Sequence, residues 1–156
     1  MFKPDTSHDV SRDSLQQFHK LPWQSRLMLV VAGTSLAAIF AVACWLTPDP
    51  RGFGTHQQLG LPECNFRSVT GVNCPHCGMT TSFCFLVRGD LKGAWQANPC
   101  GILLAAILVV LTPWCFYVGV TGHWALTDDP MTWAVRTAIV YIVIAAVIWI
   151  LRSALW

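Results

Sequence analysis

Three cysteines in one short loop are the residues whose types and spacing could do chemistry. Cys74 and Cys77 are separated by two residues, and Cys64 precedes them in the same loop. Thiols at Cys-x-x-Cys spacing lie close enough to share one metal ion or to close a small disulfide ring. Pro75 stiffens the turn, and Gly78 permits a positive φ, so backbone N–H groups can point at the sulfurs and stabilise thiolate charge. This loop, residues 64–77, is called the cysteine knuckle below.

Metal binding is the first interpretation of the knuckle. Zinc takes four ligands at ~2.0–2.3 Å, and the three cysteines supply three of them. His76, between the paired thiols, and His56, earlier in the chain, are candidates for the fourth, beside water or a partner chain. Glu63 is the only carboxylate near enough to act as a base, so a structural site without turnover is favoured over an enzyme.

A redox interpretation stays open. Cys74 and Cys77 could form a reversible disulfide, with Cys64 as the exchange partner. Cys-Pro-His-Cys is similar to the motif of strongly oxidising thioredoxin-fold enzymes, where the histidine helps to lower the pKa of a thiol. The chain has no pattern for a thioredoxin domain, so the comparison would be with helical membrane thiol oxidoreductases. A third interpretation is a static disulfide or metal staple in an accessory subunit.

The other cysteines are not expected to join the knuckle. Seven is an odd number, so at least one thiol must be free, ligated or intermolecular. Cys44, Cys100 and Cys115 lie in or at the ends of apolar segments and are expected to be inert. On a continuous helix Cys84 would lie ~10 Å along the axis from Cys77, too far to bind the same ion.

The segments on either side of the knuckle, which must position it, are long and apolar, as in a membrane protein. With 54% hydrophobic and 12% charged residues, the chain is too apolar for an ordinary soluble domain. Three segments, at about 27–46, 101–120 and 133–151, are long enough to cross ~30 Å of hydrocarbon. A formal charge of +2 without a basic face excludes nucleic-acid binding. The sequence therefore predicts an all-α membrane protein in contact with a lipid bilayer.

A short helix is expected in the region 51–97, after the knuckle. Thr80 or Thr81 is predicted to cap it, and Gly89 to stop it. About ten residues cannot cross a bilayer alone, so this helix either lies at the interface or dips into the membrane.

The ends of the segments fix the domain boundaries. Asn98 as N-cap and Pro99 at the first helical position are predicted to open the second span. Residues 1–24 are polar and are predicted to form a cytoplasmic tail, and 25–156 a single membrane domain.

The distribution of cations bears on topology. Three crossings leave Lys and Arg nearly balanced between the two sides. If residues 72–87 cross as a fourth element, one side collects most of the cations. The positive-inside rule favours that arrangement, with both termini cytoplasmic and Cys64 outside.

A longer pattern runs through this region. Cys-Pro-His-Cys-Gly-Met-Thr, then Gly-Asp, then Asn-Pro, resembles the hallmark of the small bacterial membrane proteins catalogued as "domain of unknown function 2752". The resemblance covers roughly residues 60–115 and implies a helical architecture in the bacterial cytoplasmic (inner) membrane, without an assigned activity. The family's marked positions fall on Cys64, Thr70, Gly71, Cys74, Pro75, Cys77, Gly78, Thr80, Gly89, Asp90, Asn98 and Pro99. Thr81 stands where the family usually has arginine.

Taken together, these patterns predict three transmembrane helices plus one short membrane-dipping or interfacial helix after the knuckle. The knuckle is predicted to bind zinc through Cys64, Cys74, Cys77 and His76, with no other cofactor. Small residues on the first span, among them Gly33 and Ala37, favour packing against a membrane-protein partner or a second copy.

Overall fold

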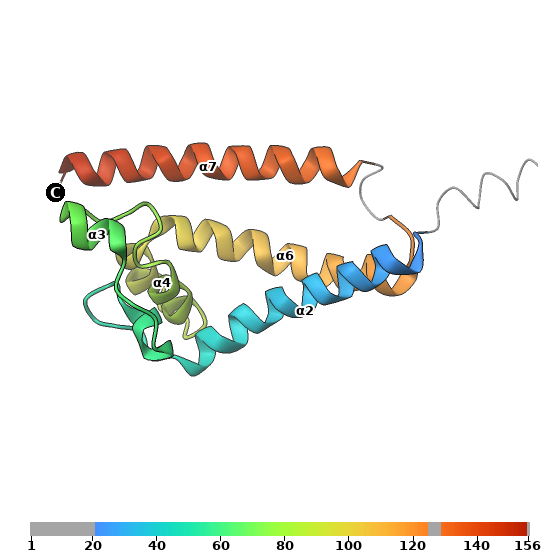
Figure 1. The fold of residues 1–156 in the computed structure, drawn as a ribbon, viewed down its shortest axis with the longest axis horizontal. Helices are drawn as coiled ribbons and strands as arrows, with labels where there is room; N and C mark the ends of the chain where they lie inside the picture. The colour runs from blue at the N-terminus through green and yellow to red at the C-terminus, as the bar shows by residue number, and fades with distance from the viewer. Residues whose placement is uncertain (1–20, 125–128, 156) are drawn as a thin grey trace, which may run out of the picture.

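The computed structural model describes residues 21–124 and 129–155, and the secondary-structure elements in these ranges are all helices, joined by loops and turns (Figure 1). Most of the predicted N-terminal tail therefore lies outside the described residues. The elements are α2 (Trp23–Trp45), η1 (Thr55–Leu59), α3 (Asn65–Thr70), α4 (Met79–Leu86), α5 (Leu91–Ala97), α6 (Pro99–Thr121) and α7 (Pro130–Leu155).

Helices α2, α6 and α7 are each long and apolar enough to cross a membrane, which confirms the predicted all-α class and its three spans. The predicted start of α6 is also confirmed. The Asn98 side chain accepts a hydrogen bond from the backbone N–H of Cys100 at 2.9 Å, and Pro99 occupies the first turn. Proline suits that position because its missing N–H would have no partner within the helix.

Helices α2 and α6 run antiparallel and pack along one another (Figure 1). Gly119 allows the close approach, since a Cβ there would lie 2.8 Å from Cγ2 of Val30. Helix α7 stands apart for most of its length and contacts the other elements near its C-terminus. There Trp149 Nε1 donates a hydrogen bond to the Asn73 carbonyl at 2.7 Å.

The short helix α4 packs into the space between the C-terminal end of α2 and the N-terminal end of α6. Phe83 and Cys84 are buried there, and the Phe83 ring lies 5.7 Å from that of Phe40. Gly101 permits the contact with α6, because a Cβ at this position would meet the Ser82 hydroxyl at 2.6 Å. The core cluster consists of Ala43, Leu46, Phe83, Cys84, Ala105 and Leu108.

Two predictions about this short helix need correction. Its N-cap is Gly78, not a threonine, and it ends at Leu86, with Gly89 in the turn that follows. Eight residues rise only ~12 Å, and α5 turns back to the end where the knuckle lies. Residues 72–87 therefore contain no helix long enough to cross a bilayer, and a fourth crossing there stays a prediction.

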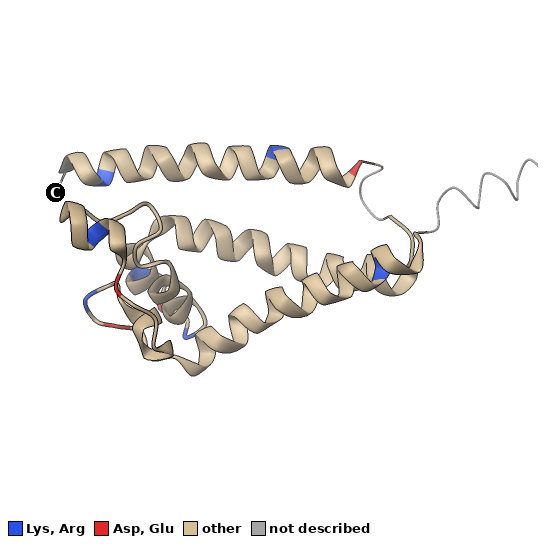
Figure 2. Ribbon diagram, in the orientation of Figure 1, with Lys and Arg blue, Asp and Glu red and all other residues tan. Residues whose placement is uncertain are grey.

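Three arginines cap helices to which they do not belong. Arg26 donates to the carbonyls of Gly119 and Val120 at the end of α6, at 3.0 and 2.6 Å. The Arg88 guanidinium likewise donates to backbone carbonyls at the end of α2. The Arg152 guanidinium donates to backbone carbonyls at the end of α5. The last carbonyls of a helix lack hydrogen-bond donors within the helix and carry partial negative charge. A guanidinium donates hydrogen bonds to them and balances that charge. Figure 2 shows the charged residues gathered toward the helix ends and the loops.

Candidate metal centre

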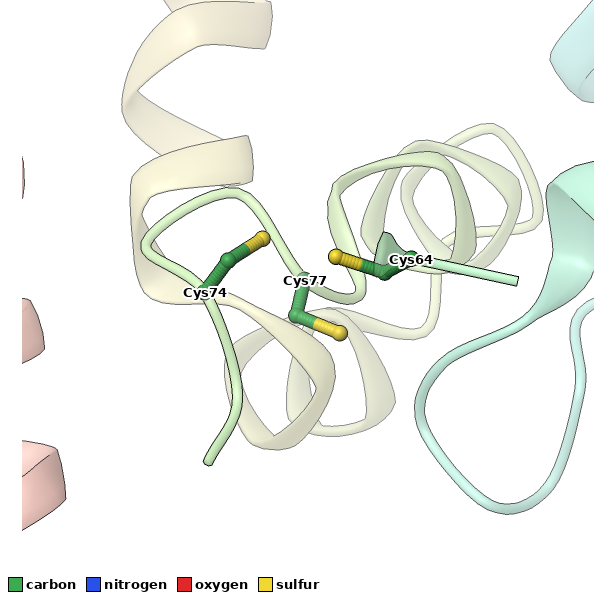
Figure 3. Close-up of side chains that lie close together, drawn as sticks. All are labelled: Cys64, Cys74 and Cys77. Carbon is green, nitrogen blue, oxygen red and sulfur yellow. The ribbon is translucent and has the colours of Figure 1, made fainter. Parts of the chain in front are cut away.

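The structure brings Cys64, Cys74 and Cys77 together. Cys64 immediately precedes α3 as its N-cap, and the other two lie in the turn before α4. Their sulfur atoms all lie within 4.8 Å of one another, and Figure 3 shows the side chains converging on a common space. Among the described residues, these three form the group of His, Cys, Asp and Glu side chains that could hold a metal ion.

A tight turn holds the paired thiols. The Cys77 N–H donates to the Cys74 carbonyl at 3.0 Å, and Gly78 follows with φ of 84°. A Cβ at Gly78 would lie 2.5 Å from the Gly52 carbonyl oxygen and 2.7 Å from that of Ala97. Glycine is therefore required here for its conformation and for the space, and the predicted positive φ is confirmed.

Asn98 joins this turn to the start of α6. Its Nδ2 donates to the carbonyls of Pro75 and Cys77, both at 3.1 Å, while its Oδ1 caps the helix. The side chain is 1% exposed. Sequence reasoning assigned only the cap to Asn98. The two bonds to the turn were missed because they connect parts of the chain that only the fold brings together.

A second buried polar contact anchors the loop before the knuckle. The hydroxyls of Thr55 and Thr81 lie 2.8 Å apart, and both residues are fully buried. The Thr55 hydroxyl also accepts from the N–H of Asp49 at 3.0 Å. Thr81, noted as the departure from the family pattern, thus ties η1 to α4. Thr81 has this role because it is buried, and nothing in the sequence indicated that burial.

The thiols of Cys64 and Cys74 differ in pKa. The backbone N–H of Arg67, in the first turn of α3, points at Cys64 and lowers the pKa of its thiol, and the neighbouring Cys74 thiol adds to this effect. Burial, followed by the proximity of Cys64, raises the pKa of Cys74 to about 11. Cys64 therefore ionises more readily than Cys74, and a thiolate at Cys74 needs a compensating cation.

The candidate fourth ligands lie around the same space without joining the sulfur cluster. His56 and His76 both line a pocket of ≈ 180 Å³ with the three cysteines. The Nε2 atom of His56 lies 3.1 Å from the Pro62 carbonyl, which holds the ring by a hydrogen bond. His76 is exposed. A fourth coordination position thus faces a pocket that imidazole or water can reach.

The remaining cysteines lie away from the centre, as predicted. All seven are free thiols. Cys84 is fully buried in the core cluster between α4 and its neighbours. Cys100 and Cys115 are buried on α6, and Cys44 is exposed near the end of α2.

Comparison with known proteins supports the resemblance and assigns no activity. The family described as "Protein of unknown function (DUF2752)" matches residues 64–112, from the first knuckle cysteine into the middle of α6. This match confirms the family resemblance over that stretch. No curated protein and no solved structure matches the chain.

Proposed function

We propose that this is a multi-pass membrane protein in which Cys64, Cys74 and Cys77 bind one structural zinc ion. The observation that carries the proposal is the approach of three sulfur atoms to within 4.8 Å. A tetrahedral ion with Zn–S bonds of ~2.3 Å requires sulfurs ~3.8 Å apart, so small side-chain rotations complete the site. The ion would tie α3 to the turn before α4.

Zinc suits the donor set. Thiolates are soft ligands, and a structural zinc site needs neither a redox partner nor a catalytic base. A divalent ion also provides the charge that favours ionisation of Cys74, whose thiol has a raised pKa. His76 is the proposed fourth ligand because its exposed ring can turn into the pocket, with His56 or water as the substitutes.

The cellular setting is part of the proposal. We place the protein in the bacterial cytoplasmic membrane, with the residues before α2 in the cytoplasm. The metal would stabilise the surface of the knuckle for contact with another membrane protein or a second copy.

A thiol oxidoreductase is the alternative, and the acidity of Cys64 favours it. Its thiolate could attack a disulfide between Cys74 and Cys77, forming a mixed disulfide with one sulfur and releasing the other as thiolate. Making the Cys74–Cys77 disulfide would remove two electrons and two protons, which a quinone in the membrane could accept. A third alternative is a static disulfide between Cys74 and Cys77 in an accessory subunit, which would stabilise the loop and catalyse no reaction.

Elemental analysis beside thiol counting tests these proposals. We expect about one zinc per chain in the detergent-purified wild type and none in the double variant Cys74→Ser/Cys77→Ser. Cys44→Ser is the matched control, because Cys44 is an exposed cysteine outside the knuckle. It should keep the wild-type zinc content. Wild type without metal, with two additional thiols only after reduction, would overturn the zinc proposal in favour of a disulfide.

A further inference from the structure

A second pocket lies where the C-terminal end of α7 approaches the knuckle and the junction of α5 and α6. Its volume is ≈ 390 Å³. Its walls come from separate stretches of the chain, represented by Arg51, Asn73, Gln96, Trp149 and Arg152. Cys74 and Cys77 are part of the wall that separates it from the pocket of the metal centre.

The lining of this pocket carries positive charge. It includes Arg51 and Arg152 and, among the described residues, no aspartate or glutamate. Asp49 neutralises Arg51 at 2.7 Å. Arg152 forms no ion pair within the described part of the chain, and its guanidinium donates to the carbonyls of Gln96 and Ala97 at 3.2–3.4 Å. Arg152 therefore lines the pocket without a carboxylate partner among the described residues, and only helix carbonyls share its charge.

The position of the pocket along α7 indicates what kind of anion can reach it. Trp149 and Arg152 lie in the last two turns of a helix long enough to span a bilayer. Tryptophan and arginine at such ends lie at the level of the lipid headgroups. Only 6% of the spanning window of α7 is buried, so lipid chains can lie beside the helix beneath the pocket.

We propose that this pocket binds the phosphate of an anionic phospholipid headgroup. Arginine pairs with phosphate through two parallel hydrogen bonds, and basic pockets between transmembrane helices are known to hold acidic headgroups. The acyl chains would follow the apolar surface of α7 below Ile148. The proposed phosphate contact is Arg152, which is not one of the proposed zinc ligands, although Cys74 and Cys77 line both pockets.

Native mass spectrometry of the full chain in detergent tests this proposal. The probes are dioleoyl phosphatidylglycerol, zwitterionic dioleoyl phosphatidylcholine and inorganic phosphate. We expect saturable binding of one phosphatidylglycerol, weakened roughly tenfold in Arg152→Gln, and no saturable binding of phosphatidylcholine. Lys92→Gln is the matched control, since Lys92 is an exposed cation at the same end of the molecule outside the pocket. It should bind as wild type does.

A second variant guards against a folding defect, because Arg152 also caps α5. Ser153→Trp would fill the pocket and leave the arginine in place, and it should weaken phosphatidylglycerol binding similarly. Equal binding by wild type, Arg152→Gln and Ser153→Trp would overturn the proposal. Displacement of the lipid by millimolar inorganic phosphate would also overturn it, in favour of a site for a free anion.

Discussion

At the scale of single residues, Asn98 connects the helical scaffold with the metal centre. Its one side chain satisfies two carbonyls of the Cys-x-x-Cys turn and one N–H of α6. Buried carbonyls left without a donor cost about 1–3 kcal/mol each, and loss of an N-cap costs about 1 kcal/mol. We infer that Asn98 is a positioning residue for Cys74 and Cys77.

Substitutions at Asn98 should separate its two tasks. Asn98→Asp keeps the oxygen that caps α6 and loses both donors to the turn, so zinc should leave faster, by roughly tenfold, in a chromophoric chelator assay. Asn98→Ala should lose the cap as well and lower the thermal midpoint in detergent further. Zinc release from Asn98→Asp at the wild-type rate would show that the turn holds its shape without these bonds.

At the scale of elements, Arg88 determines how the end of α2 is held. Its guanidinium donates to the carbonyls of Ala43, Cys44 and Leu46, and to the carbonyl of Cys84 in the preceding helix α4. The structure assigns it to the C-terminus of another helix, where a fixed cation balances the helix dipole and satisfies carbonyls that no N–H reaches.

Removing this cap should destabilise the contact of α4 with α2. Arg88→Met keeps the side-chain length and removes all the donors, and we expect a loss of about 2–4 kcal/mol in the free energy of unfolding. Arg88→Lys should recover part of it. The measurement is the midpoint of unfolding in detergent, with Lys92→Met as an exposed control that leaves the midpoint unchanged. Equal midpoints for Arg88→Met and wild type would contradict the cap.

At the scale of the whole molecule, three helices long enough to span a membrane would place the two ends of the chain on opposite sides of it. The knuckle, the start of α6 and the end of α7 lie at one end, and the start of α2 lies at the other (Figure 1). Of the Lys and Arg residues in the described ranges, Arg26 and Arg136 lie toward the end where α2 begins, and the others lie toward the opposite end, namely Arg51, Arg67, Arg88, Lys92 and Arg152. Arg26, Arg88 and Arg152 donate to helix carbonyls, so their positions are explained by the fold and carry less weight in the positive-inside argument.

Epitope tags at the two termini should therefore report opposite sides of the membrane. We expect antibody to reach the C-terminal tag in spheroplasts and the N-terminal tag only after permeabilisation, with the residues before α2 in the cytoplasm. An antibody against an internal cytoplasmic protein controls for intactness. Both tags on one side would restore a fourth crossing between α2 and α6.

The sequence by itself determined the membrane class, the three spans, the start of α6 and the set of three cysteines. Each of these depends on local properties, which are the length of an apolar run, a cap residue beside a proline, or the spacing of thiols. Tertiary structure alone decided that the three sulfur atoms lie within 4.8 Å of one another, that Asn98 holds the turn, and that α5 turns back after the short helix α4. Those outcomes depend on contacts between residues distant in the sequence, where burial and unsatisfied carbonyls select the partner.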